Sequence, residues 1–280
     1  MSKSEPKDRS TPTEKSSAKP RLTRKERERR EFLRSAAMVA GVTGFSLLNL
    51  IPTLTNAAPR LRPPGALDEK EYLASCIKCG QCVQVCPVEA IFLADIMDGQ
   101  GQGAAYIDAR NQACDFSCDG LQCVLACPTG ALTHEINYSH ETRMGVAELR
   151  LPDSCLAMQK KGFKGVTRGI EYQGVLRFED IDRWEPQKLN EQEFDIPLCD
   201  LCVRLCPIEI RANQCDAGAP PSGDKNQCPP ERAIMLSVEK KDDGGLQYRP
   251  TILEGCVGCG VCEMVCPTAA PSIVIKERTA

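Results

Sequence analysis

Histidine is scarce in this 280-residue sequence, which contains only His134 and His140. Neither histidine follows a C-x2-C pair, as the attachment of c-type haem requires, so we expect both residues to lie at the surface. The glycine-rich stretch 98–103 lacks the strand-turn-helix spacing of a nucleotide site and is expected to be a flexible loop. The sequence therefore gives no sign of haem or nucleotide binding.

Positive charge is also scarce outside the N-terminal region. Residues 1–57 contain 12 Lys and Arg against 6 Asp and Glu, which leaves 23 basic and 32 acidic residues in 58–280, a net charge of −9. A protein that binds nucleic acid needs clustered positive charge on its folded part. We therefore expect no nucleic-acid partner for this chain.

Long apolar runs are missing as well, and no segment after residue 57 is apolar enough to cross a membrane. The first residues, 1–28, are rich in Ser, Lys, Arg and Pro and have few large apolar side chains. Such a composition cannot bury enough apolar surface to fold, so we expect this segment to be disordered.

A weakly apolar run, residues 35–54, follows the sequence Arg29-Arg30-Glu31-Phe32-Leu33 and precedes small residues at 55–57 that suit cleavage. This arrangement resembles a twin-arginine export signal. An uncleaved membrane anchor is the alternative, although Gly and polar residues make the run poorly apolar. We therefore expect residues 1–57 to comprise a disordered basic region plus a signal peptide, and residues 58–280 to form the exported domain.

Cysteine, by contrast, is abundant, with 18 residues. Two segments, 76–87 and 256–267, follow the spacing C-x2-C-x2-C-x3-C-P identically. This is the run of bacterial ferredoxins that holds 4Fe-4S clusters, in which three close thiolates wrap one cubane and the fourth reaches the neighbouring one. Gly80 and Gly260 permit the tight turn that this wrapping needs. The predicted ligands are Cys76, Cys79, Cys82 and Cys86 in the first motif, and Cys256, Cys259, Cys262 and Cys266 in the last.

Zinc binding and disulfide bonding are the alternative explanations for these two motifs. Zinc sites usually show two separated C-x2-C pairs rather than one quartet. Repeated C-x2-C-x2-C triplets crowd thiols that could be bridged only with strain. The spacing therefore favours iron-sulfur clusters.

A further motif, residues 114–128, has a longer front than these two. Its ending, C-x3-C-P, matches the closing half of the first motif, so we interpret it as a second cluster motif with a stretched beginning. The predicted ligands are Cys114, Cys118, Cys123 and Cys127.

The remaining motif, residues 155–207, lacks its first cysteine at the usual place. Cys199, Cys202 and Cys206 match the second, third and fourth ligands of a cluster motif. Chain order selects Cys155 as the first ligand, and the entropic cost of the long loop between grows only slowly with its length.

Two other cysteines, Cys215 and Cys228, lie in a Pro- and Gly-rich segment. Cys228 is the alternative fourth-site ligand, because it is followed by proline and by residues that echo the end of the first motif. If Cys155 is the ligand instead, Cys215 and Cys228 could form a disulfide in an oxidising compartment.

The overall pattern predicts a loop-rich α+β fold, a ferredoxin-like polyferredoxin built around four 4Fe-4S clusters. We expect these clusters, rather than a large apolar core, to organise folding. Brief helices are expected after the Cys-Pro steps. Short strands are expected over 145–151, 174–178, 233–239 and 246–253, and segments 156–198 and 208–232 look like insertions.

Sixteen cysteines suffice to coordinate four clusters fully. No iron is then open to a substrate, so the sequence indicates an electron carrier rather than an enzyme, with potentials set by hydrogen bonds to sulfur, charge and solvent exposure. The spacing does not show whether the first motif shares clusters with the second motif or with the last.

The order of these features resembles the NapG/MauM family, exported ferredoxin-type proteins associated with periplasmic nitrate reductase and with methylamine utilisation. In that family a lone cysteine lies close upstream of a CDxC segment, which supports Cys155. The resemblance covers about residues 29–275, and the lengths of 156–198 and 208–232 depart from it. It rests on the twin-arginine signal, RLRPPGA at 60–66, the first two motifs, RMGVA at 143–147, CDLC at 199–202 and the last motif.

The resemblance implies a periplasmic protein that is exported folded by the twin-arginine route, after its clusters are assembled inside the cell, and that associates with the membrane through a partner. Its expected role is to relay electrons from a membrane-bound quinol-oxidising ferredoxin-type protein to a periplasmic redox enzyme or cytochrome. Two alternatives are an accessory maturation factor for a periplasmic oxidoreductase, and a tightly bound iron-sulfur subunit of a larger complex such as a quinol dehydrogenase.

Overall fold

The computed structural model describes residues 23–54, 60–95, 101–118, 120–177, 187–240 and 245–277. Two compact units are present, Met1–Pro52 and Thr53–Ala280. The predicted cleavage site at 55–57 and the predicted disorder of residues 1–22 lie outside the described residues.

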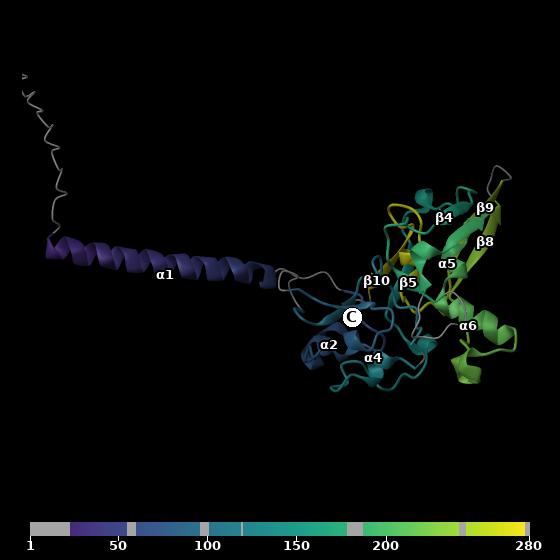
Figure 1. Cartoon of the computed structure of the whole chain (residues 1–280), viewed down its shortest axis with the longest axis horizontal. Coiled ribbons are helices and arrows are strands. Elements are labelled where there is room, and N and C mark those ends of the chain that lie inside the picture. The colour runs from purple at the N-terminus through teal and green to yellow at the C-terminus, as the bar shows by residue number, and fades with distance from the viewer. Residues whose placement is uncertain are drawn as a thin grey trace, which may run out of the picture. The chain divides into compact units, whose positions relative to one another are not determined.

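One long helix, α1 (Arg24–Leu54), drawn in purple in Figure 1, makes up nearly all of the described part of the first unit and ends two residues beyond it. Its start is fixed by Thr23, whose hydroxyl accepts a hydrogen bond from the Glu26 N–H (3.4 Å) while the Glu26 carboxylate accepts one from the Thr23 N–H (2.8 Å). Arg24 also pairs with Glu28 one turn later (3.0 Å). The predicted disorder is therefore wrong for residues 24–28. Among the described residues, no helix is both long and apolar enough to span a membrane.

The second unit repeats one local structure four times. Each cysteine motif contains a single-turn helix whose second residue is the third cysteine of the motif, and the fourth cysteine lies two residues beyond the helix end. These helices are α3 (Gln81–Gln84), α4 (Gln122–Leu125), α5 (Leu201–Arg204) and α7 (Val261–Met264).

The predicted position of the helices after the Cys-Pro steps is correct only at Pro207, where α6 (Pro207–Asp216) begins. After Pro87 and Pro128 the chain turns instead. Glu89 (φ 51°) and Gly130 (φ 70°) adopt left-handed backbone conformations there, which a right-handed helix cannot continue. The remaining helices are α2 (Glu69–Ser75) and short 3-10 turns at Ser139–Glu141, Pro152–Ser154, Leu189–Glu191, Pro221–Gly223 and Lys225–Gln227.

The strands of the described residues form five separate antiparallel pairs. The predicted strands at 145–151, 174–178, 233–239 and 246–253 are confirmed as β3, β5, β8 and β9, each with slightly different ends. The pairs are β1 (Ile91–Leu93) with β2 (Ala105–Ile107), β3 (Gly145–Leu149) with β10 (Ile273–Glu277), β4 (Phe163–Val166) with β7 (Glu193–Ile196), β5 (Val175–Leu176) with β6 (Gln187–Lys188), and β8 (Ile234–Lys240) with β9 (Leu246–Ile252).

The second unit has two halves, which we define as the first half (60–134) and the second half (145–277). Figure 1 shows α2 and α4 on one side of this unit, and α5, β8 and β9 on the other. One apolar core runs through both halves and includes many alanines and cysteines. Residues such as Phe116 from the first half and Met264 from the second are almost fully buried in it.

The segment 156–198 is tied into the fold. Within its described residues, β4 pairs with β7, and Leu176 and Leu189 are buried in the core. The Gln112 side chain exchanges hydrogen bonds with both backbone groups of Val175, at 2.9 and 3.0 Å. The insertion therefore packs against the second cysteine motif.

A candidate site of four cysteine sets

Backbone conformation aims the cysteines of the first and last motifs inward. In the first motif Lys78 (φ 60°) and Gly80 (φ 74°) flank the second cysteine, and in the last motif Gly258 (φ 71°) and Gly260 (φ 94°) do so. Left-handed conformations at both flanks turn the chain sharply, so that successive thiols face one side. The predicted roles of Gly80 and Gly260 as turn residues are confirmed.

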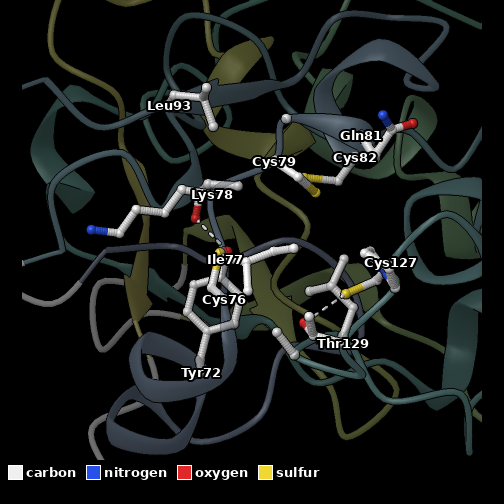
Figure 2. A pocket seen from close by; sticks show the side chains of 15 residues that line it. Tyr72, Cys76, Ile77, Lys78, Cys79, Gln81, Cys82, Leu93, Cys127 and Thr129 are labelled. Carbon is white, nitrogen blue, oxygen red and sulfur yellow. Dashed lines mark hydrogen bonds between the residues drawn. The ribbon is translucent and has the colours of Figure 1, made fainter.

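The first group of thiols, set A, combines Cys76, Cys79 and Cys82 with Cys127 of the second motif. These four residues line a single cavity, and Figure 2 shows their side chains around a common space. The pKa of Cys82 is about 11, above its usual value, mainly because the thiol is buried. The neighbouring charges of Cys76, Cys79 and Cys127 also raise this pKa, whereas a backbone hydrogen bond lowers it.

The second group, set B, combines Cys114, Cys118 and Cys123 with Cys86 of the first motif. Burial raises the pKa of Cys114 well above its usual value, and the nearby charges of Cys118, Cys86 and Cys123 raise it further. Helix α3, which ends two residues before Cys86, also packs against α4, which contains Cys123.

The third group, set C, combines Cys256, Cys259 and Cys262 with Cys206 of the fourth motif, and all four line another cavity. Burial raises the pKa of Cys262 well above its usual value, and Cys259, Cys256, Cys202 and Cys206 add to this rise. The last motif is therefore completed by a cysteine from an earlier segment.

The fourth group, set D, combines Cys155, Cys199 and Cys202 with Cys266 of the last motif. Burial is the first cause of the raised pKa of Cys199, about 11, and the charges of Cys155 and Cys266 also raise it. A hydrogen bond from the Cys199 N–H to the Lys161 carbonyl (3.0 Å) holds the two segments together.

The two possible fourth-site ligands occupy different places. Cys155 is buried beside the thiols of set D, whereas Cys228 is bonded to Cys215 in a disulfide with a Cα–Cα distance of 5.8 Å. The other sixteen cysteines are outside disulfides. The structure thus brings all sixteen predicted ligands together in four sets of four.

Fourth cysteines are exchanged between neighbouring motifs. Cys86 and Cys127 cross between the first two motifs, and Cys206 and Cys266 cross between the last two, which is the sharing seen in two-cluster ferredoxins. The first motif is therefore paired with the second motif, a choice that spacing alone leaves open.

The four sets lie in the order A, B, C, D. Helices α3 and α4, which contain Cys82 of set A and Cys123 of set B, pack against each other, as do α5 and α7, which contain Cys202 of set D and Cys262 of set C. Sets B and C meet where the Cys114 N–H donates a hydrogen bond to the Cys259 carbonyl (3.3 Å). The exchange within each half and this contact between halves produce one continuous series.

Polar groups also surround the sulfur atoms. The Ala90 N–H donates to Cys86 Sγ (3.3 Å), and the Ser272 N–H donates to Cys266 Sγ (3.4 Å). The Thr268 hydroxyl lies 3.1 Å from Cys266 Sγ. Hydrogen bonds to sulfur stabilise thiolate ligands and tune an iron-sulfur cluster, so this donor set suits such a cofactor.

The thiols also need a positively charged partner, because burial and mutual repulsion disfavour four adjacent thiolates. Within the described ranges, no three His, Cys, Asp or Glu side chains are grouped closely enough to hold a single metal ion. In sets A and C the four thiols instead border a shared cavity. Four thiolates around such a space are the ligands that a 4Fe-4S cubane requires.

Several residues near the thiols were not singled out by sequence reasoning. Arg62 pairs with Glu69 (2.5 Å) and donates to the Ala105 carbonyl (2.8 Å), which anchors helix α2 immediately before Cys76. Asp115, beside Cys114, is 2% exposed. In the sequence, Asp115 could have been recognised as a charged residue next to a predicted cysteine ligand. Arg62 could have been recognised as part of the RLRPPGA segment.

Two protein-family models match the chain. A model of a 4Fe-4S dicluster domain matches residues 75–131, which contain sets A and B, and a model of a 4Fe-4S binding domain matches residues 251–272. Domains that bind 4Fe-4S clusters are therefore present in both halves. The segment of Cys155 and the CDLC segment lie outside both matches.

Known proteins resemble the chain over most of its length. The ferredoxin-type protein NapG of Escherichia coli K12 is 31% identical over 253 residues, which cover 88% of this chain and 84% of that protein. The methylamine utilization ferredoxin-type protein MauM of Methylorubrum extorquens is 31% identical over 89% of each chain. The ferredoxin-type protein NapF of Escherichia coli K12 is 23% identical over 54% of this chain. No solved structure matches this chain.

Proposed function

Because the chain belongs to the NapG/MauM family of ferredoxin-type iron-sulfur electron carriers, we propose that it is a periplasmic relay with four 4Fe-4S clusters. Electrons would pass from a membrane-bound quinol-oxidising partner to a periplasmic redox enzyme. The observation that carries this proposal is the continuous order of the four cysteine sets, from A through B and C to D.

Each set would hold one cluster through its four cysteines. Bound 4Fe-4S clusters supply one-electron redox chemistry. All four thiolates of a set are then used in coordination, so the chain offers no position for a substrate on iron, and it acts as an electron carrier rather than an enzyme. The surrounding residues bury the thiols and donate hydrogen bonds to sulfur, as Ala90 does to Cys86.

The two ends of the series differ in exposure. Cys79 of set A is exposed, and Ile77, which directly follows Cys76 of the same set, is 62% exposed, whereas none of the four cysteines of set D is exposed. Electron exchange between proteins is fastest where a redox group approaches the surface. Set A is therefore the proposed point of contact with one redox partner.

Export as a folded protein is the second part of the proposal. Arg29 and Arg30 lie on the exposed surface of α1, ahead of the weakly apolar run. Cluster assembly requires reduced thiols, whereas the Cys215–Cys228 disulfide suits an oxidising compartment. Folding and cluster insertion inside the cell, followed by export, satisfy both requirements.

The test is an anaerobic reductive titration of the exported protein, followed by mixing with membranes that contain reduced quinol. We expect uptake of about four electrons per chain, one for each cluster, and reduction by quinol at the turnover rate of the periplasmic enzyme. Uptake of about two electrons would contradict the four-cluster relay. A periplasmic enzyme that keeps full quinol-dependent activity after removal of this protein would instead indicate a maturation factor.

A further inference from the structure

The junction between the halves contains a buried carboxylate. Asp115 follows Cys114 directly and is 2% exposed. Its Oδ1 accepts a hydrogen bond from the Ser117 N–H (2.9 Å), and its Oδ2 accepts one from the Arg177 N–H (2.9 Å). Both of these donors are backbone amides.

This carboxylate lies close to both central cysteine sets. Asp115 is adjacent in sequence to Cys114 of set B, and the Cys114 backbone contacts that of Cys259 of set C. The position follows from the Cys114–Cys259 backbone hydrogen bond, which brings the second motif against the last one. One buried carboxyl group thus lies at the junction of two sites that belong to different halves.

We propose that Asp115 is a tuning residue that lowers the reduction potentials of the two central clusters, those of sets B and C. This inference rests on the proposed function, because it requires a cluster in each of these sets. Reduction adds one negative charge to a cluster, and a buried carboxylate nearby opposes that addition more strongly than an exposed one would. Asp115 therefore adjusts the potentials of the two clusters between which electrons would pass from one half to the other.

A purely structural role is the competing explanation. Through its two hydrogen bonds, Asp115 shapes the turn after Cys114 and holds the end of β5. The two roles separate in the variant Asp115→Asn, which keeps the shape and one acceptor oxygen but removes the charge. Asp115→Glu keeps the charge, and Asp115→Ser is a second neutral variant whose hydroxyl can still accept from Ser117.

The experiment is an EPR-monitored redox titration of the full exported chain and its variants, compared at equal iron and sulfide content. Glu239→Gln is the matched control, because it removes one exposed carboxylate from β8. In Asp115→Asn we expect the midpoint potentials of two of the four one-electron steps to rise by about 59 mV. This rise corresponds to a change of about tenfold in the reduced-to-oxidised ratio at fixed potential. Asp115→Glu and Glu239→Gln should leave all four steps close to those of the parent.

The outcomes separate this inference from the proposed function. A parent with fewer than four steps would overturn the four-cluster relay and the inference that depends on it. The role of Asp115 alone would be overturned if the parent shows four steps but the potentials in the neutral variants do not rise at two sites only. They could stay in place, fall, or change equally at all four sites. If Asp115→Asn loses iron, the shift must appear in Asp115→Ser, and its absence there would make the residue structural.

Discussion

The backbone N–H of Cys114 donates a hydrogen bond to the carbonyl of Cys259 at 3.3 Å. Each residue belongs to a cysteine set completed by a neighbouring motif, so this one bond brings the two central sets into contact. The Arg211 guanidinium reinforces the junction by donating to the Phe116 carbonyl (2.7 Å). The halves therefore meet through the backbone of predicted ligands, where small changes in packing should affect electron passage.

Close packing at this junction predicts that Gly260→Ala is strongly destabilising. Gly260 has φ +94°, and an added Cβ would lie 2.5 Å from Ala109 Cβ. Gly130→Ala is the matched control, because Gly130 has φ +70° but open space around its Cα hydrogen. Both variants should lose about 1–2 kcal/mol from backbone strain, and Gly260→Ala should lose about 1–3 kcal/mol more from overpacking. Anaerobic denaturant unfolding measures both, and equal losses would contradict the packing described for the junction.

A second link between the halves predicts the effect of losing Arg110. Its guanidinium donates to the carbonyls of Glu263 (2.6 Å), Cys266 (3.0 Å) and Thr268 (2.8 Å). Arg110→Met should therefore loosen the segment that supplies Cys266 to set D, at a cost of about 2–4 kcal/mol, and should lower the iron content. The exposed Arg150 provides the control Arg150→Met. Iron analysis and unfolding midpoints that are the same in both variants would refute this anchoring role.

Because of the disulfide, we expect the stability of the protein to depend on a thiol reductant. We expect its iron content to be independent of the reductant. Cys215 and Cys228 are 13 residues apart in sequence, and a bond that closes such a loop stabilises by about 3 kcal/mol. A thiol reductant should lower the unfolding midpoint of the parent, while Cys215→Ser should have the lower midpoint with or without reductant. Both should retain parental iron. Loss of iron in Cys215→Ser would mean that this pair contributes to a cluster site.

Exposure of set A predicts where a redox partner binds. Ile77, which directly follows Cys76 of set A, is 62% exposed, and Ile170 in the 156–198 segment is 74% exposed. Ile77→Glu should weaken productive contact by about tenfold, equivalent to about 1.4 kcal/mol, because an apolar side chain that would be buried on binding becomes charged. Ile170→Glu should have little effect. Stopped-flow reduction by quinol-containing membranes measures the difference, and equal slowing by both variants would argue against contact at set A.

Some of this architecture can be predicted from the sequence because ferredoxin motifs depend on local spacing. The motifs at 76–87 and 256–267 predict three converging thiols, since Gly80 and Gly260 permit the turns between them. The strands at β3 and β8 can also be predicted, because short apolar or alternating runs favour extended structure.

Other features depend on tertiary contacts that local patterns do not encode. The pairing of the first motif with the second brings Cys127 to the same cavity as Cys82, although the two residues are distant in sequence. At the junction with the last motif, Ala109 and Ala113 lie against Gly260. Segment 156–198 looks inserted in sequence, yet its hydrogen bonds to Gln112 tie it to the second motif. The buried position of Asp115 likewise depends on Arg177, which is distant in sequence.

The most direct test of four cysteine-bound clusters is to measure iron and acid-labile sulfide per chain in anaerobically purified, exported protein. The parent should contain about sixteen irons, four for each cubane. Cys155→Ser should lose about a quarter of them, whereas Cys228→Ser should retain the parental amount, because Cys155 lies in set D and Cys228 is bonded to Cys215. Half the expected iron in the parent, or a loss only in Cys228→Ser, would contradict the fourth site and break the proposed electron path at set D.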